Sequence, residues 1–353
     1  MLFLSSSEQA EWERLAGEVL AEGAAPGRYD RAVRSNLAGM FRFFVGSRLA
    51  NAGLSGPARS WFAAGALEEG DGLFMNAFVT SFLERQKGRF AMAAAPFEDP
   101  APFVHFAGVP VFRSAREHFL RQAADSLPDF SRPLRFMDVG CGNGALGAAL
   151  VAKLLESGKV REIGEILQID PSPAMSRLAE KTVGEILPHA PVRSRTCRIQ
   201  EIAGSLERHV DVALCSLSFH HLTWEEKVRH LSSLGRRIDH LLIFELDANH
   251  DTPELHSPEL AASVYQTYGR VIDAVFAHDA PLEVAVACVD RFLMTEAMSL
   301  MTQPRGERAD YHMLRRQWHE LCECALGEGF DCRCDATAYA DDFEDLFTLH
   351  YGR

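Results

Sequence analysis

Apolar residues recur at helical spacing through the first third of the chain. Trp12, Leu15, Val19 and Leu20 fall on one face of a helix for which Ser7 is the expected N-cap. Further helices are expected over residues 29–51, 55–66, 72–83 and 116–124, with an irregular, proline-containing segment at 92–110. Residues 1–127 are therefore expected to form a helical N-terminal cap that serves substrate binding or dimerisation.

The pattern changes at residue 136 to that of a strand, a tight turn and a helix. Phe136 to Val139 form a mostly apolar run, three glycines follow at alternate positions, and residues 145–155 read as a helix. Glycine permits a positive φ and lets a ligand approach the backbone closely. The N–H groups of the first helical turn also point towards any ligand bound there. This stretch therefore predicts a ligand-binding turn at the carboxyl end of a strand.

Six further strands are expected after this turn. They are predicted at residues 163–170, 192–199, 210–215, 241–245, 329–334 and 346–351. The strands at 210–215 and 241–245, the fourth and fifth of the sheet, are largely apolar, as in parallel strands that are covered on both faces. The last two are joined by a short loop and should pair antiparallel. Strands that alternate with helices predict an α/β domain over residues 128–353, with a helical insert at about 252–300.

Charge and composition limit the kinds of partner that this protein is expected to bind. The 353 residues carry 49 acidic and 36 basic side chains, a net charge of −13, without a dense lysine or arginine run. Because this field repels a phosphate backbone, nucleic acid is not an expected partner. The apolar opening is too short for a signal sequence, and no apolar run has the length of a membrane span. A cytoplasmic protein without a membrane partner is expected.

The eight cysteines are expected to be reduced thiols in that compartment. Cys322 and Cys324 form one closely spaced pair, and Cys332 and Cys334 form a second. The C-x-C spacing is not that of common zinc sites. Buried, inert thiols are the preferred interpretation.

The turn alone fits two classes of ligand. Gly140, Gly142 and Ala145 match G-x-G-x-x-A, which a dinucleotide site tolerates, and Asp138 is placed to pair with a cationic ligand or to bond the loop amides. The second strand ends in Asp170, a position from which a carboxylate accepts the ribose hydroxyls of an adenosine or caps the next helix. These positions predict an adenosyl cofactor without choosing its type.

Motif I of class I S-adenosylmethionine (SAM) methyltransferases resembles the sequence of this turn, Asp138-Val139-Gly140-Cys141-Gly142-Asn143-Gly144. Their fold is a Rossmann-like, seven-stranded α/β sheet whose last strand runs antiparallel, as the final strand pair predicts here. The resemblance implies SAM as cofactor and S-adenosylhomocysteine (SAH) as product. The expected cofactor-binding residues are Asp138, Gly140, Cys141, Gly142, Gly144, Asp170, Pro171, Gln200, Glu201 and Ser216.

A second resemblance, to GRAS-domain proteins, covers the chain after the fifth strand. It rests on residues 245–254 with Tyr265, Tyr268 and Asp273, and on Glu307-Arg308, His312, Arg316, Trp318 and Gly329-Phe330. GRAS proteins are plant regulators with a methyltransferase-like fold, and bacterial relatives are thought to methylate small molecules. The resemblance implies either such an enzyme or a binding protein without catalysis. A nicotinamide (NAD(P)) oxidoreductase is the third alternative.

The acceptor is expected to be a small, natural-product-like molecule. After the fourth strand the chain reads Ser216-Leu217-Ser218-Phe219, without the Asn/Asp-Pro-Pro-aromatic motif of methyltransferases that act on amino groups of adenine or glutamine. In-line methyl transfer mainly needs alignment, and a base is required only for a protonated hydroxyl or a carbon acid.

The ends of the strands supply the candidates for chemistry. His220, Glu245 and His250 are the candidate catalytic residues, because imidazoles titrate in the useful range and a carboxylate can orient one. The candidate substrate-binding residues are His221, Asn249, Tyr265 and Tyr268. A metal held by Glu245, His250, Asp251 and His278 is an alternative, but the spacing is irregular and no metal site is assigned. A homodimer through the helical cap is a further expectation.

Overall fold

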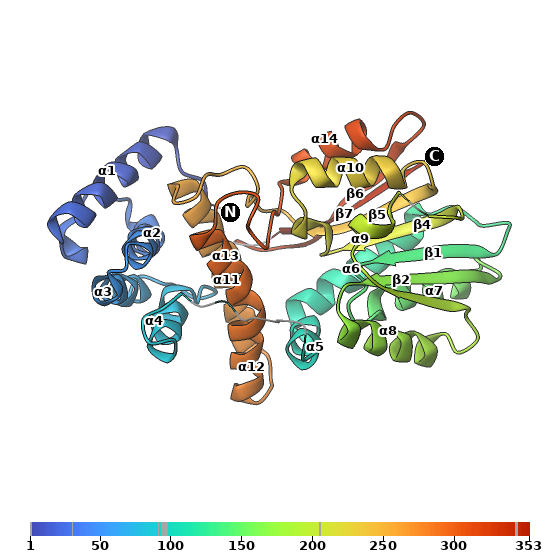
Figure 1. Ribbon diagram of the computed structural model, residues 1–353, viewed down its shortest axis with the longest axis horizontal. Helices are drawn as coiled ribbons and strands as arrows, with labels where there is room; N and C mark the ends of the chain where they lie inside the picture. The colour runs from blue at the N-terminus through green and yellow to red at the C-terminus, as the bar shows by residue number, and fades with distance from the viewer. Residues whose placement is uncertain (1, 30, 91, 93–97, 205, 343–344) are drawn as a thin grey trace. The chain divides into compact units, whose positions relative to one another are not determined.

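The computed structural model describes residues 2–29, 31–90, 92, 98–204, 206–342 and 345–353. The chain divides into two compact units. A helical unit comprises residues 1–96, 248–310 and 341–344, and a sheet unit comprises residues 97–247, 311–340 and 345–353. Figure 1 shows the elements of both units, which are described separately below.

The sheet unit contains a seven-stranded sheet in the order β3-β2-β1-β4-β5-β7-β6. Its strands are β1 (Leu134–Val139), β2 (Ile163–Asp170), β3 (Val192–Thr196), β4 (Val210–Ser216), β5 (Ile238–Leu246), β6 (Asp331–Ala340) and β7 (Asp345–Gly352). The first five strands are parallel, while β7 runs antiparallel to both β5 and β6. The predicted fold class, with an antiparallel last strand, is confirmed.

Helices cover both faces of this sheet. They are α5 (Ala101–Gly108), α6 (Pro110–Ser126), α7 (Ala145–Glu156), α8 (Pro173–Ile186), the short α9 (Ile199–Ile202), the 3-10 turn η3 (Phe219–His221), α10 (Trp224–Leu234) and α14 (Arg315–Ala325). On one face, residues of α10 and α14 share a buried core with β1, β4, β5 and β7. Figure 1 shows α6, α7 and α8 on the other face. This two-sided burial explains why β4 and β5 are almost continuously apolar.

The helices of the helical unit come from two stretches of the chain. Its elements are α1 (Ser6–Glu22), the 3-10 turns η1 (Pro26–Tyr29) and η2 (Ser35–Leu37), α2 (Ala38–Asn51), α3 (Ser55–Ala66), α4 (Asn76–Arg85), α11 (Pro258–Ala277), α12 (Leu282–Cys288), the π-helical turn η4 (Val289–Leu293) and α13 (Met294–Thr302). Phe43 of α2 packs against both Phe62 of α3 and Tyr265 of α11, with ring centroids 5.9 and 5.6 Å apart. Aromatic packing thus joins the insert to the N-terminal helices.

The unit boundaries differ from the expected division at residue 127. Helix α6 belongs to the sheet unit, because the buried Phe119 lies on Phe244 of β5 with ring centroids 5.1 Å apart. The expected insert belongs to the helical unit instead of the α/β domain. Both differences arise from contacts between residues that are distant in the sequence, which hydrophobic periodicity does not specify.

Several local predictions were wrong in detail. Ser5, and not Ser7, caps α1, because its hydroxyl accepts from the N–H of Glu8 in a capping box. Residues 101–108 form α5 and Pro110 begins α6, within a segment expected to be irregular; proline is well tolerated in the first helical turn. Residues 93–97 of that segment lie outside the described residues. Strand β3 ends at Thr196, so Ile199 begins α9 instead of ending the strand.

The eight cysteines are free thiols, but the expectation that all four C-x-C cysteines are buried was wrong. Cys322 is buried, whereas Cys324 and Cys332 are exposed. None of the helices among the described residues combines the length and the apolar character needed to cross a bilayer.

Candidate functional site

The predicted glycine turn connects β1 to α7 and adopts the conformation that only glycine accepts readily. Gly140, Gly142 and Gly144 have φ values of 66°, 54° and 71°. A side chain on Gly140 would collide with Ser218, and one on Gly144 would lie 2.6 Å from the amide nitrogen of Gln168. The turn therefore leaves a backbone cradle in which a ligand can reach the N–H groups at the start of α7.

Asp170 holds this turn in place. One carboxylate oxygen accepts from the N–H of Gly142 at 2.9 Å, and the other accepts from the N–H of Ser172 at 2.8 Å. Burial raises the pKa of Asp170, while its bonds to Ser172 and Gly142 act in the opposite direction. An ionised carboxylate accepts about four hydrogen bonds, so the bonds from Gly142 and Ser172 leave capacity for two ribose hydroxyls. Ser172, and not Asp170, is the residue that caps α8.

Asp138 lies near the end of β1, two residues before Gly140, and is 4 % exposed. Burial, together with the negative charge of Asp170, raises its pKa to about 7. Burial, with a smaller effect of Asp138 and Asp170, raises the pKa of the Cys141 thiol. A cationic ligand group next to Asp138 would favour its ionised form. The cradle and the two carboxylates thus fit the adenosine, the sulfonium and the ammonium of SAM.

The remaining predicted cofactor residues occupy the ends of the neighbouring strands. Pro171 is exposed directly after β2, and the half-buried Ser216 ends β4. Gln200 is half-buried on α9. The exposed carboxylate of Glu201 accepts from the backbone N–H of Arg198 at 2.8 Å, so it stabilises the start of its own helix. Contacts of these four residues with the cofactor remain predictions.

Two histidines and a glutamate gather beside the turn, and we call His220, Glu245 and His312 the histidine cluster. The Nδ1 atoms of His220 and His312 lie 3.0 and 3.5 Å from the same Glu245 oxygen, Oε2. The two imidazole rings are 4.0 Å apart between centroids. Each histidine is 5 % exposed and Glu245 is 0 % exposed.

The cluster holds Glu245 in its charged form. Burial would raise the pKa of this carboxyl, but His220 and His312 hold it below its ordinary value. The other oxygen, Oε1, accepts from the N–H of Ser218 at 3.0 Å. The Tyr311 N–H donates to the His220 carbonyl at 2.6 Å, which fixes the segment that carries His312.

His312 is the member of the cluster that was not predicted as a catalytic residue. In the sequence it belongs only to the stretch that resembles GRAS proteins. It lies far from Glu245 in the chain, and reaches it because α14, which follows directly, packs its buried Trp318 into the core beneath β5. The histidine just before the last predicted helix was the available signal.

Ser218 connects the glycine turn to the histidine cluster. Its side chain lies against Gly140 and donates to the Val139 carbonyl at 2.8 Å, while its N–H donates to Glu245. The preceding residue, Leu217, has a φ of 45°, which is strained for a residue with a branched side chain. The exposed His221 interacts electrostatically with Asp170. The ends of β1, β2, β4 and β5 thus form one continuous group of polar residues.

The other predicted site residues belong to the helical unit. His250 is fully buried, with its Nδ1 3.0 Å from Asp310, and the Tyr268 hydroxyl donates to the same Asp310 oxygen at 2.6 Å. Tyr265 is buried in the aromatic packing described above. Asn249 donates to Glu259 at 3.2 Å. Roles for these four residues in catalysis or acceptor binding remain predictions.

The four residues considered as an alternative metal site do not form one group of possible ligands in the structure. Among the described residues, the sets of histidine, cysteine and carboxylate side chains close enough to share an ion do not include Asp251 or His278. Asp251 accepts from Arg305 at 2.8 Å. The histidine cluster is one of the sets that do meet the distance condition.

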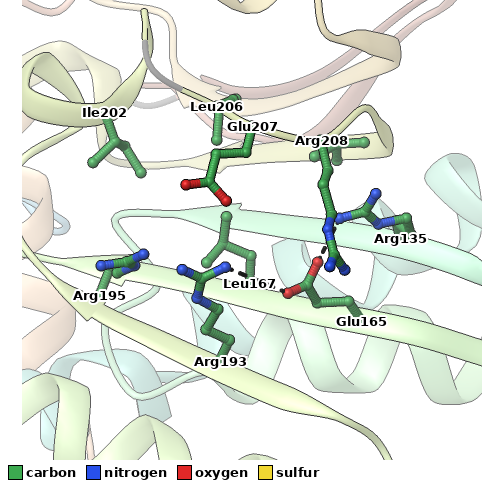
Figure 2. A pocket seen from close by; sticks show the side chains of 10 residues that line it. Arg135, Glu165, Leu167, Arg193, Arg195, Ile202, Leu206, Glu207 and Arg208 are labelled. Atoms are coloured by element: carbon green, nitrogen blue, oxygen red, sulfur yellow. Dashed lines mark hydrogen bonds and ion pairs between the residues drawn. The ribbon is translucent and has the colours of Figure 1, made fainter.

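An arginine-rich pocket lies elsewhere on the sheet unit (Figure 2). Arg135, Arg193, Arg195 and Arg208 line it with Glu165 and Glu207. Its residues come from β1, β2 and β3, from the end of α9 and the loop after it, and from the start of β4; Arg135, Glu165 and Val210 lie near the amino ends of their strands. Ligands of open α/β sheets bind beyond the carboxyl ends of the strands. This pocket is therefore not the cofactor site.

Comparisons with known proteins agree with the fold. SCL7 from Oryza sativa superposes with a TM-score of 0.57 at 13% identity, covering 82% of this chain and 93% of that chain. This similarity shows a shared fold and fits the resemblance to GRAS proteins. No curated protein matches the chain.

Two enzymes of lower structural similarity are also found. The magnesium protoporphyrin IX methyltransferase ChlM of Synechocystis PCC 6803, solved with SAH bound, has 17% identity and a TM-score of 0.41, with 71% and 92% of the two chains covered. A putative O-methyltransferase of Nostoc punctiforme PCC 73102 has 13% identity and a TM-score of 0.43, with 78% and 67% covered.

A family described as "Methyltransferase domain" matches residues 137–242. The matched stretch runs from β1 into β5 and contains the glycine turn, Asp170 and His220. The strand order, the cradle and the matched stretch agree. The chain carries a class I methyltransferase domain, and the protein is a SAM-dependent methyltransferase.

Proposed function

We propose that this methyltransferase acts on a small, natural-product-like acceptor in the cytoplasm. The observation that carries the proposal is the bridge formed by Ser218, which contacts the glycine turn on one side and the histidine cluster on the other. One edge of the sheet thus offers a cradle for the cofactor next to ionisable groups for an acceptor. The free thiols support a reducing compartment.

Different residues of the chain would bind different parts of the cofactor. The turn between Gly140 and Gly144 would hold the part of SAM that lies against its backbone N–H groups. Asp170 would accept hydrogen bonds from the ribose hydroxyls of SAM. The carboxylate of Asp138 would attract the positively charged groups of SAM. Once bound, SAM supplies a methyl group already activated on a sulfonium.

The acceptor must present its nucleophile in line with that methyl group and must lose any proton that blocks it. His220 and Glu245 are the groups we propose for this task, since Glu245 fixes the His220 ring and stays charged. The absence of an Asn/Asp-Pro-Pro-aromatic sequence at Ser216–Phe219, and the net charge of −13, favour a small molecule over nucleic acid.

Methyl transfer from radiolabelled SAM tests this function directly. Purified protein would be incubated with labelled SAM and a panel of phenols, enols and carboxylic acids, and label would be counted in the extracted small molecules. We expect transfer to at least one class, and loss of transfer in Asp170→Ala. SAM binding without transfer to any compound would instead support the non-catalytic GRAS-like alternative.

A further inference from the structure

We propose that the histidine cluster is a binding site for one divalent transition-metal ion, with zinc the best fit to its donors. His220, Glu245 and His312 would each give one ligand atom. All three belong to the sheet unit, so the site does not depend on the helical unit. Two imidazoles and one carboxylate are a donor set that zinc uses in catalytic sites.

The distances between the donor atoms match this coordination. Zinc lies about 2.0–2.2 Å from nitrogen and oxygen ligands, so two ligands at tetrahedral angles stand roughly 3.3 Å apart. Glu245 Oε2 is 3.0 Å from His220 Nδ1 and 3.5 Å from His312 Nδ1, values on either side of that spacing. The three ligand atoms all lie within 4.8 Å of one another. A bound ion would therefore require only small side-chain movements.

Charge gives an independent argument. Glu245 is fully buried, and a buried carboxylate is costly to ionise unless an opposite charge compensates it. Neutral imidazoles donate hydrogen bonds but no charge, and protonating both would place two cations on rings 4.0 Å apart. Lys227 is a buried cation of the same unit. Its ammonium donates to the Tyr311 carbonyl at 2.6 Å and lies over the Trp318 ring. A divalent ion would compensate the carboxylate at the point where both rings converge.

The surroundings fix the donors in position. Oε1 of Glu245 accepts from Ser218, which orients the carboxylate, and the Tyr311 N–H binds the His220 carbonyl. Hydrogen bonds of this kind hold the ligands of established metal sites and influence their affinity. The cluster therefore has both the donors and the supporting contacts of a built site.

Three protein ligands leave a fourth position on a tetrahedral ion, as in catalytic zinc sites. Resting on the proposed function, this position would take an ionisable oxygen of the acceptor, such as that of a phenol, enol or carboxylic acid. With an ion bound, His220 and Glu245 would promote loss of the acceptor proton as metal ligands and not as a free base, because a bound cation lowers the pKa of such an oxygen and holds it in place. The proposal thus restricts the acceptor to molecules with an acidic oxygen.

Cobalt binding tests the site without any acceptor. Full-length protein treated with a chelator would be titrated with Co²⁺, and visible absorption would report the coordination geometry. We expect one Co²⁺ per chain with the strong bands of a tetrahedral ion, displaced by Zn²⁺. Glu245→Gln and His312→Asn should weaken binding about tenfold or more. His189→Ala, at an exposed histidine of the same unit, is the matched control and should bind normally.

SAH titration of the same samples shows which variants retain the fold of the sheet unit. The absence of a tetrahedral spectrum in wild-type protein would overturn the proposal. Unchanged binding in both cluster variants that still bind SAH would overturn it as well. SAH binding without cobalt binding would refute the metal site alone, whereas cobalt binding without methyl transfer to any acceptor would refute the proposed function alone.

Discussion

Three buried carboxylates lie at the ends of β1, β2 and β5, and each has a different electrostatic environment. Glu245 has its pKa held below the ordinary value because two histidines outweigh its burial. Asp170 is bonded to two backbone N–H groups, yet burial still raises its pKa. Asp138 combines burial with the nearby charge of Asp170, so its pKa reaches about 7. The protonation of Asp138 should therefore change with pH near neutrality.

Asp138 should make the ligand-free protein less stable as pH rises from about 4 to about 7. Its pKa is raised on folding, so the native state binds the proton more tightly than the unfolded state does. That stabilisation is complete below the unfolded pKa of about 3.9, and is lost as pH passes the folded value near 7. The rise of about 3 units corresponds to roughly 4 kcal/mol at most.

Chemical denaturation of wild type and Asp138→Asn at pH 5 and pH 8 measures this effect. We expect the stability of wild type relative to the variant to fall between the two pH values, because asparagine does not titrate. Asp129→Asn, at an exposed position, should follow wild type. Parallel pH profiles for wild type and Asp138→Asn would show that Asp138 does not carry a raised pKa.

At the scale of elements, helix α6 covers the face of the sheet opposite α10 and α14. Periodicity predicted the helix over residues 116–124, but could not show which unit it joins. The contact between Phe119 and Phe244 assigns it to the sheet. The insert shows the same limit, since Tyr265 on α11 packs against Phe43 from the N-terminal part of the chain.

Phe119→Ala should destabilise the sheet unit by about 3–5 kcal/mol, because it removes a fully buried ring and leaves a cavity beneath β5. Urea unfolding followed by circular dichroism measures the change. Phe3→Ala removes the same atoms from a position that is 70 % exposed, and should change stability by no more than about 0.5 kcal/mol. A cost below about 1 kcal/mol for Phe119→Ala would contradict the assignment of α6 to this core.

At the scale of the whole molecule, the sequence predicted the parts whose signals are local. The glycine turn, Asp170 after the second strand and the antiparallel ending are each specified by adjacent residues, and together they gave the correct fold class. Contacts over long sequence distances were not predictable in this way. His312 reaches Glu245 through the packing of α14, and the helical insert joins the N-terminal helices through aromatic contacts.

The same large-scale features separate the alternative functions. A dinucleotide oxidoreductase would continue to a sixth parallel strand, whereas β7 runs antiparallel to β5 here. The match to a methyltransferase domain covers the cradle itself. The glycine cradle also makes a regulatory protein that has lost its cofactor a poorer explanation.

The most direct test of the central claim is calorimetric titration of the purified protein with SAH, comparing wild type with Asp170→Ala. We expect micromolar binding by wild type and a loss of at least about tenfold in the variant, since two ribose hydroxyls lose their acceptor. Asp125→Ala, at an exposed position of the same unit, should bind like wild type. Failure of wild type to bind SAH would contradict the SAM site at the glycine turn.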